Sequence, residues 1–246
     1  AILTGIFKSL PPAEIVVLSA NPRETAKKYG VKSAHFIPTG IRSTIKGLFG
    51  LRFLRTLYHI ATCDLFILGG GGLFTDEKPH AIILWGIHAQ FAYLFKKQVY
   101  MYAQSVGPLD SKWAQKAVRE TFKKAFSITV RDRESKDLLD RMDIGKQVQV
   151  VSDPAFFMDL PQTPPERHDR YMILSVRPWK NVPGELYKNL AQYVDWLYRE
   201  RGIKALLLPF QEKPDNDFRE LNKIFEQVGD GKAAEILKWD SGLERI

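Results

Sequence analysis

The run from Gly69 to Asp76 (GGGGLFTD) is the stretch whose residue types most directly suggest chemistry. Glycine has no Cβ, so four glycines in a row let the backbone approach a ligand closely and present N–H donors to an anion. Asp76 lies four residues after Gly72 and could orient or deprotonate a hydroxyl. The alternative is a tight turn followed by a solvent-exposed capping aspartate. The run has neither the G-x-G-x-x-G pattern of dinucleotide sites nor the Gly-Lys-Ser/Thr of a P-loop.

Two further groups of polar residues lie where strands are expected to end. Gln104 and Ser105 can donate and accept hydrogen bonds, as binding of sugar hydroxyls requires. The alternative for them is a plain loop that the Gly-Pro pair at 107–108 turns into the next helix. Arg131 could hold a carboxylate or phosphate with two parallel hydrogen bonds. It could instead pair internally with Asp132, which is expected to cap the following helix.

The remaining candidates are weaker or lie later in the chain. Asp153 precedes a proline, an ordinary turn signal, and structural use is expected. Arg177, in the segment SVRPWK, is expected to point across a cleft at the glycine run and clamp an anion. The alternative is a surface arginine stacked on Trp179. Among the scattered histidines only His80 has even loose ligand spacing, to Asp76, so no metal site is predicted.

Apolar strands that alternate with helices of 10–15 residues predict an α/β fold built from βαβ units and parallel sheets. In such sheets ligands bind beyond the carboxyl ends of the strands, which is where the candidate residues above are expected. The strands of the first half are predicted over residues 14–20, 35–38, 64–68, 98–103, 127–130 and 147–151. Helices are predicted from Asn21 to Gly30 and over residues 42–61, 81–95 and 112–125.

The segment 160–167 (LPQTPPER) has three prolines and no periodicity, and predicts a linker. It separates an N-terminal domain, residues 1–160, from a C-terminal domain, residues 168–246. The second domain is predicted to have strands at 171–176 and 204–208 and helices at 183–201 and 215–228. Two βα units are too few for a complete doubly wound domain, so the second domain is expected to be truncated.

The formal net charge of +8, from 36 basic and 28 acidic residues, favours anionic partners such as phosphorylated metabolites or a membrane face. The basic residues are spread over many segments and form no single block, so no nucleic-acid partner is predicted. The lone cysteine, Cys63, cannot form an internal disulfide and is expected to be a small buried residue. No apolar run approaches the ~20 residues of a bilayer span. These features favour a cytoplasmic protein, with peripheral contact at the inner face of the membrane as a further option.

Six motifs in register give a more specific indication than any one of them. In order, they are GGGGLFTD, YAQSVGPL, SITVRDRESKDLL, VVSDPAFFM, SVRPWK and LLPFQ, and together they resemble the polysaccharide pyruvyl transferases over nearly the whole chain. The resemblance implies two Rossmann-like domains in a GT-B-like arrangement. It also implies transfer of a pyruvyl group from phosphoenolpyruvate to two hydroxyls of a sugar, forming a ketal and releasing phosphate.

The resemblance further implies the partners and the role of each candidate residue. The acceptor would be a sugar of a cell-surface polysaccharide or of its lipid-linked precursor, and phosphoenolpyruvate would be a co-substrate, with no metal or other cofactor. Asp76 would activate the acceptor hydroxyl, and Arg177 and Arg131 would bind the donor. The sugar site would be lined by Gly70, Gly71, Gly72, Gln104 and Ser105. Family members also carry an Arg-Leu-His segment with a catalytic histidine near their C-terminus. The chain is expected to lack that segment and to be inactive or impaired alone.

Two other functions fit parts of the pattern. A GT-B glycosyltransferase using a nucleotide sugar would have two domains and a glycine loop as well. It would need an acidic residue for the ribose late in the second domain, which is missing here. A non-catalytic sugar-binding module is the other alternative. Release of phosphate from phosphoenolpyruvate, against release of nucleotide from UDP-sugars, separates the two enzymes.

Overall fold

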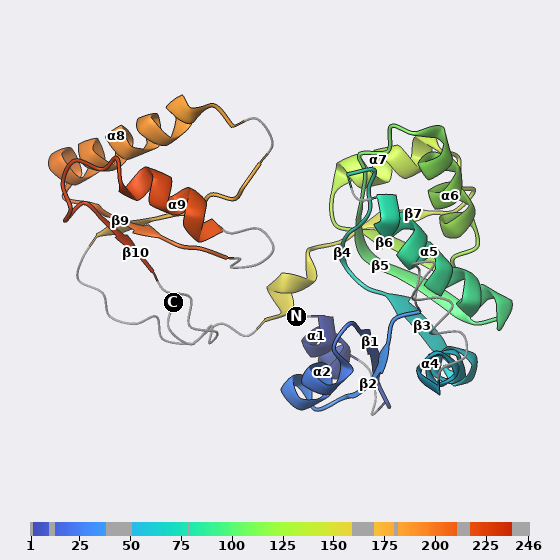
Figure 1. Cartoon of the computed structure of the whole chain (residues 1–246). Helices are drawn as coiled ribbons and strands as arrows, with labels where there is room; N and C mark the ends of the chain where they lie inside the picture. Colours follow the sequence, from blue (N-terminus) through green and yellow to red (C-terminus); the bar gives the residue numbers. More distant parts are fainter. Residues whose placement is uncertain are drawn as a thin grey trace. The chain divides into compact units, whose positions relative to one another are not determined.

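The chain divides into two compact units, Ala1–Asp159 and Leu160–Ile246. The structure, a computed structural model shown in Figure 1, describes residues 2–9, 13–37, 51–77, 79–158, 170–179, 182–210 and 217–237. Each unit contains parallel strands connected by helices, which confirms the predicted α/β class. The predicted linker, 160–167, lies outside the described residues.

The main sheet of the first unit has five strands, all paired in parallel. Its order is β3-β5-β6-β7, and β4 pairs with β5 as well. The strands are β3 (Leu65–Leu68), β4 (Gly71–Phe74), β5 (Gln98–Val106), β6 (Ser127–Val130) and β7 (Val148–Val150), and the helices between them are α5 (Pro79–Leu94), α6 (Lys112–Lys123) and α7 (Arg133–Arg141). A short 3-10 helix, Pro154–Phe157, follows β7.

Strands β3 and β4 run one after the other along the same side of β5, with Gly69 and Gly70 between them. A Cβ on Gly70 would lie 3.1 Å from the carbonyl oxygen of Ala103 and 3.3 Å from Cγ of Pro154, which is tighter than most real contacts. Opposite this break β5 is also irregular, because its register with β6 shifts between Met101 and Gln104 and Ala103 has a φ of 47°. Glycine at position 70 therefore lets two irregular strands approach each other.

The sequence places the end of β5 too early. The predicted strand ends at residue 103, but β5 continues to Val106 because Gln104 and Ser105 pair with Gly71 and Gly72 of β4. Two of the four glycines are thus strand residues. The candidates Gln104 and Ser105 are not loop residues, and lie near the end of a central strand.

A smaller parallel sheet precedes the main one along the chain. It pairs β1 (Val16–Ser19) with β2 (Lys32–His35), and α2 (Pro22–Tyr29) connects the two strands. The predicted strand at 35–38 is therefore displaced toward the N-terminus. Helix α1 (Ile2–Ser9) contacts the 3-10 helix, and α4 (Leu51–Thr62) packs against β2. The first half of the predicted helix 42–61 lies outside the described residues.

The core of the first unit lies between the main sheet and its helices. Phe74 at the end of β4 and Phe122 of α6 are fully buried, and their rings meet edge to face with centroids 5.0 Å apart. His88 of α5 is also buried. Its Nε2 accepts a hydrogen bond from the backbone N–H of Ile37 at 2.9 Å, and its Nδ1 lies 2.7 Å from the carbonyl oxygen of Leu84. The imidazole therefore links the segment after β2 to α5 by a hydrogen bond.

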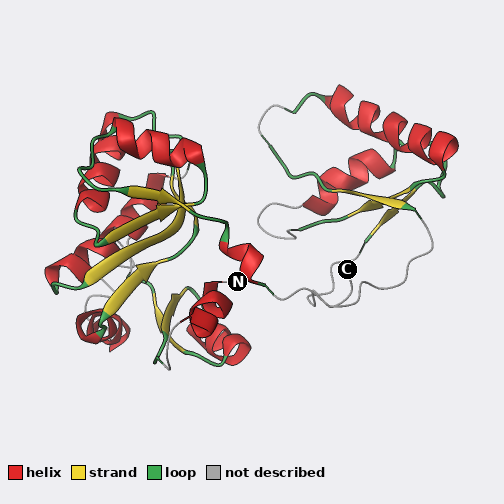
Figure 2. Cartoon of the chain, turned by 180° about the vertical axis from the view of Figure 1, so that it is seen from behind, coloured by secondary structure: helices red, strands yellow, loops and turns green. Residues whose placement is uncertain are grey.

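The second unit has a three-stranded parallel sheet of order β10-β9-β8. Its elements are β8 (Tyr171–Leu174), α8 (Gly184–Arg201), β9 (Lys204–Leu207), α9 (Asp217–Phe225) and β10 (Ala234–Ile236). Both helices lie on one face of this sheet, as Figure 2 shows. This follows from the strand order, because two right-handed crossovers that advance in the same direction place their helices on the same side.

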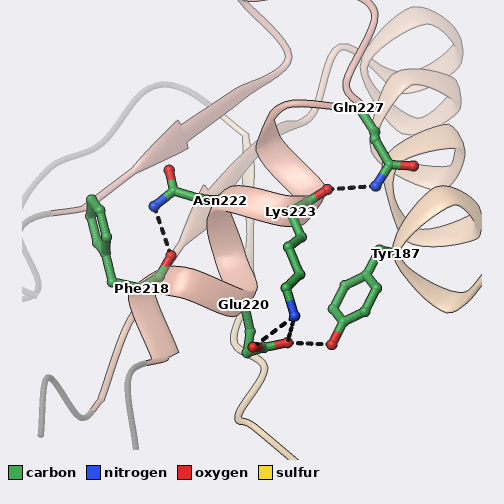
Figure 3. Close-up of polar contacts among 6 residues, drawn as sticks. All are labelled: Tyr187, Phe218, Glu220, Asn222, Lys223 and Gln227. Carbon is green, nitrogen blue, oxygen red and sulfur yellow. Dashed lines mark hydrogen bonds and ion pairs between the residues drawn. The ribbon is translucent and has the colours of Figure 1, made fainter. Parts of the chain in front are cut away.

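Helices α8 and α9 are joined by a buried carboxylate (Figure 3). Glu220 of α9 is 7% exposed and accepts hydrogen bonds from the hydroxyl of Tyr187 on α8 and from Nζ of Lys223, the latter at 2.8 and 2.9 Å. The Lys223 ammonium also lies 4.9 Å from the centre of the Tyr187 ring. A buried carboxylate with two donors is satisfied, and the three side chains fix how the two helices pack.

No helix in the described part of the chain is long and apolar enough to cross a membrane.

Candidate active site

The carboxyl ends of β4, β5, β6 and β7 bring most of the predicted residues to one edge of the main sheet. Asp76 follows β4, Ser105 lies near the end of β5, Arg131 and Asp132 follow β6, and Asp153 comes three residues after β7. This is the edge at which parallel α/β sheets bind ligands.

Four of these residues form one hydrogen-bonded cluster, which we call the Ser105 cluster: Ser105, Arg131, Asp132 and Asp153. The Ser105 hydroxyl donates to Oδ2 of Asp132 at 2.6 Å and accepts from Nε of Arg131 at 2.8 Å. Arg131 then reaches Oδ2 of Asp153 with Nη1 at 2.5 Å. Each side chain of the Arg131–Asp153 pair remains 34% exposed, so the pair is accessible to a ligand.

Both carboxylates of the cluster are held in their charged form, and both also begin helices. Burial raises the pKa of Asp132, but hydrogen bonds from Ser105 and Ser135 outweigh burial and leave the pKa below its usual value. The backbone N–H of Ala155, followed by Arg131, lowers the pKa of Asp153. Asp132 caps α7 through the N–H of Ser135 at 2.8 Å, as predicted, and Asp153 caps the 3-10 helix. The cluster is therefore anchored to the backbone on two sides.

Asp76 lies at the same edge and is occupied by a different set of donors. Its Oδ2 accepts from the backbone N–H groups of Asp110 at 2.5 Å and Ser111 at 2.7 Å, and its Oδ1 accepts from the Ser111 hydroxyl at 2.9 Å. The Ser111 N–H lowers the pKa of Asp76 most strongly. In this arrangement the carboxylate braces the loop that begins α6, and its low basicity does not favour proton abstraction. Its predicted catalytic role stays a prediction.

Gln104 is fully buried and hydrogen-bonds to the backbone where β3 ends, just before Gly70. Its Nε2 donates to the carbonyl oxygens of Leu68 at 2.6 Å and Gly69 at 3.2 Å. Its Oε1 has no hydrogen-bond partner among the described residues. Of the predicted sugar-lining residues, Gly72 is exposed and Ser105 half-buried, and the two pair across β4 and β5. Gly70 and Gly71 are half-buried like Ser105, so the four residues other than the buried Gln104 all reach the surface at this site.

A solvent-open hollow of about 520 Å³ adjoins the Ser105 cluster on the side of α7. Its lining includes the carboxylates of Asp110, Asp132 and Glu134 and one cation, Arg141. Such a surface repels a phosphorylated ligand and offers acceptors to hydroxyls. Its chemistry suits an uncharged sugar better than an anion.

A comparison with known families decides the assignment. A model of the family described as polysaccharide pyruvyl transferase matches residues 1–242, essentially the whole chain. The chain belongs to the polysaccharide pyruvyl transferase family. The resemblance in the sequence motifs is thereby confirmed. No curated protein matches this chain.

In this transferase, Arg177 is the predicted site residue that belongs to the second unit. It follows β8, and its guanidinium lies over the ring of Trp179 at 6.0 Å from the centroid. The stacking that the sequence offered as the alternative is therefore present. A role in donor binding stays a prediction for Arg177, as it does for Arg131.

Two residues of the transferase site, Ser135 and Asp153, make long-range hydrogen bonds that the sequence did not predict. Ser135 donates to Asp132 through its backbone and accepts the backbone N–H of Val106 with its hydroxyl at 2.8 Å, tying β5 to α7. Asp153 pairs with Arg131 as well as capping a helix. In the sequence, Ser135 is at the third position of a predicted helix and Asp153 precedes a proline. Both positions indicate capping, and neither predicts a long-range partner. No group of three or more potential metal ligands occurs in the described ranges.

Proposed function

We propose that this family member transfers a pyruvyl group from phosphoenolpyruvate to two hydroxyls of one sugar unit. The sugar would belong to a cell-surface polysaccharide or its lipid-linked precursor. One acceptor oxygen adds to C2 of the donor while the methylene carbon takes up a proton and becomes a methyl group. The second acceptor oxygen then displaces phosphate and closes the ketal. Of the two hydroxyl protons, one balances the new methyl group and the other leaves with phosphate.

The observation that carries the proposal is the Ser105 cluster, at the ligand-binding edge of a sheet in a chain that the family model covers almost entirely. Arg131 is already bound to a carboxylate, Asp153, at a partly exposed position. The carboxylate or phosphate of phosphoenolpyruvate can take the place of Asp153 with the same geometry. Arg177 is proposed as a second cation for the donor.

The acceptor is proposed to bind beside the cluster, over Gly72 and Ser105 and along the acidic hollow. The Ser105 hydroxyl, oriented by Asp132 and Arg131, can exchange hydrogen bonds with a sugar hydroxyl. Asp76 stays the proposed base for an acceptor hydroxyl. To act as one, it must exchange at least one of its present donors for the substrate.

Substitution of Arg131 tests the donor site. Arg131→Ala should raise KM for phosphoenolpyruvate by about tenfold or more in a phosphate-release assay, since a charged hydrogen bond to an anion contributes about 1.5–3 kcal/mol. Arg133→Ala is the matched control, because Arg133 is exposed and close in sequence but outside the cluster. Equal KM values for Arg131→Ala and Arg133→Ala would remove Arg131 from the donor site.

A further inference from the structure

The net positive charge of the chain arises mainly in one stretch that has no acidic residues. Between Glu24 and Asp64 the sequence has no Asp or Glu, whereas it has seven Lys or Arg residues. The rest of the chain has 29 basic and 28 acidic residues. Nearly all of the net charge of +8 therefore arises in this stretch, although the basic residues themselves are spread along the whole sequence. The seven are Lys27, Lys28, Lys32, Arg42, Lys46, Arg52 and Arg55.

Helix α4 lies in the second half of this acid-free stretch and has two distinct faces. Its inner face holds Phe53 and Leu57, which pack on the core, and the buried Thr56 and Ile60. The outer face consists of Arg52, Leu54, Arg55 and Tyr58, and Leu54 and Tyr58 are 57% and 64% exposed. The helix lies at the margin of the first unit (Figure 1).

The charges around this outer face are predominantly positive. Arg52 and Arg55 are exposed and have no ion pair with another residue that the structure describes. Glu14, two residues before β1, is bound to Lys32 at 2.8 Å. Burial lowers the pKa of His59, and Arg55 and Lys32 lower it further against the opposite effect of Glu14. The positive charge on this face therefore comes from Arg52 and Arg55, because Lys32 at the start of β2 is paired with Glu14.

We propose that the outer face of α4 docks on an anionic lipid surface, with the helix lying along the interface. Arginines attract anionic headgroups, while an exposed leucine and tyrosine on the same face enter the apolar boundary below them. A nucleic acid would satisfy the arginines but would offer no apolar layer to Leu54. The charge pattern and exposed apolar pair carry this inference independently of the reaction proposed above.

Flotation of the full chain with vesicles tests the surface. Wild-type protein should bind phosphatidylglycerol–phosphatidylcholine vesicles at low salt, and pure phosphatidylcholine vesicles far more weakly. Arg55→Glu combined with Tyr58→Ser should reduce binding on the order of tenfold or more, since each basic side chain near an anionic surface contributes about fivefold. Leu54→Ser, which keeps every charge, should also weaken binding because an inserted side chain is lost.

A control pair on α6 has the same spacing and the same change of charge. Trp113 is 45% exposed and Lys116 is exposed, three residues later, on a helix outside the acid-free stretch. Trp113→Ser combined with Lys116→Glu should leave flotation unchanged, and circular dichroism should show that each variant is folded.

Three results would overturn the assignment. The first is that wild-type protein does not bind anionic vesicles. The second is that the α4 and α6 double variants lose binding equally. The third is that Leu54→Ser binds vesicles like wild type while duplex DNA binding depends on Arg55, which would make the surface a nucleic-acid site.

Discussion

Asp76 provides the sharpest test of how the site is built, because the structure and the proposed chemistry assign it different roles. Its carboxylate accepts two backbone N–H groups and one hydroxyl from residues 110 and 111, which immediately precede α6. Asp76→Asn is the informative change. The amide oxygen can still accept the two N–H groups, and the amide nitrogen can donate to the Ser111 hydroxyl once that hydroxyl turns.

The magnitude follows from what the asparagine loses. All three hydrogen bonds can persist, but each loses its charge assistance, which is roughly half of its strength. With about 1.5–3 kcal/mol for a charged hydrogen bond and about 0.5–1.5 kcal/mol for a neutral one, the full difference would be about 3 kcal/mol. Because the carboxylate is half-exposed and solvent competes for the donors, we expect about 1–2 kcal/mol.

Thermal unfolding followed by circular dichroism measures this effect. The free-energy change corresponds to roughly 2–4 °C in Tm per kcal/mol for a chain of this size. Asp64→Asn is the control, since it removes the same charge from an exposed position. Because the folded-state pKa of Asp76 is lowered, its contribution to stability is present above the unfolded pKa of about 3.9 and is lost as pH falls through the folded pKa. A Tm equal to that of wild type at neutral pH, together with lost turnover, would refute the bracing role.

Three further outcomes follow from the packing. Gly70→Ala should lower the free energy of unfolding by about 1–3 kcal/mol, because its Cβ would crowd a carbonyl oxygen and a proline ring. Gly72→Ala is the control and should leave the free energy of unfolding unchanged, because its Cβ would meet nothing within 4 Å. Equal denaturant midpoints for the two variants would contradict this reasoning. Tyr187→Phe should cost about 1–2 kcal/mol, because the buried Glu220 loses a donor, and urea unfolding of the second unit measures it. Burial lowers the pKa of His88, so stability should be complete above pH ~6.5 and fall below it by at most about 1.4 kcal/mol per pH unit. In His88→Gln this contribution to the pH dependence should disappear, and an unchanged acid-side slope would exclude it.

The fold class was predictable because its signals are local. Apolar strands alternate with helical segments, and that pattern indicates parallel sheets whatever the distant contacts are. The Asp132 cap was predictable for the same reason, because an aspartate before a helical pattern accepts a backbone N–H three residues ahead.

The interior of the site was not predictable, because its partners are far apart in sequence. The rule that ligands bind at the carboxyl ends of parallel strands correctly placed Ser105, Arg131 and Asp132 at one edge. It could not show that Arg131 would bind Asp153, 22 residues away. Nor could it show that the donors to Asp76 would come from a loop more than 30 residues later.

In the glycine run, the local preference of the residues gave the wrong prediction because pairing with a distant strand overrides it. Glycine is a poor strand former, so four glycines predict a loop. Gly71 and Gly72 nevertheless continue the sheet because β5 extends beside them to Val106. Local propensity carries no information about such a neighbour.

The claim that this family member uses phosphoenolpyruvate as its donor is tested most directly by one 31P NMR experiment. The full chain is incubated with phosphoenolpyruvate and UDP-glucose together, with and without a panel of oligosaccharide acceptors. The account predicts that the phosphoenolpyruvate signal is replaced by inorganic phosphate only when an acceptor is present, while UDP-glucose persists. Formation of UDP with phosphoenolpyruvate left intact would contradict it and identify a glycosyltransferase.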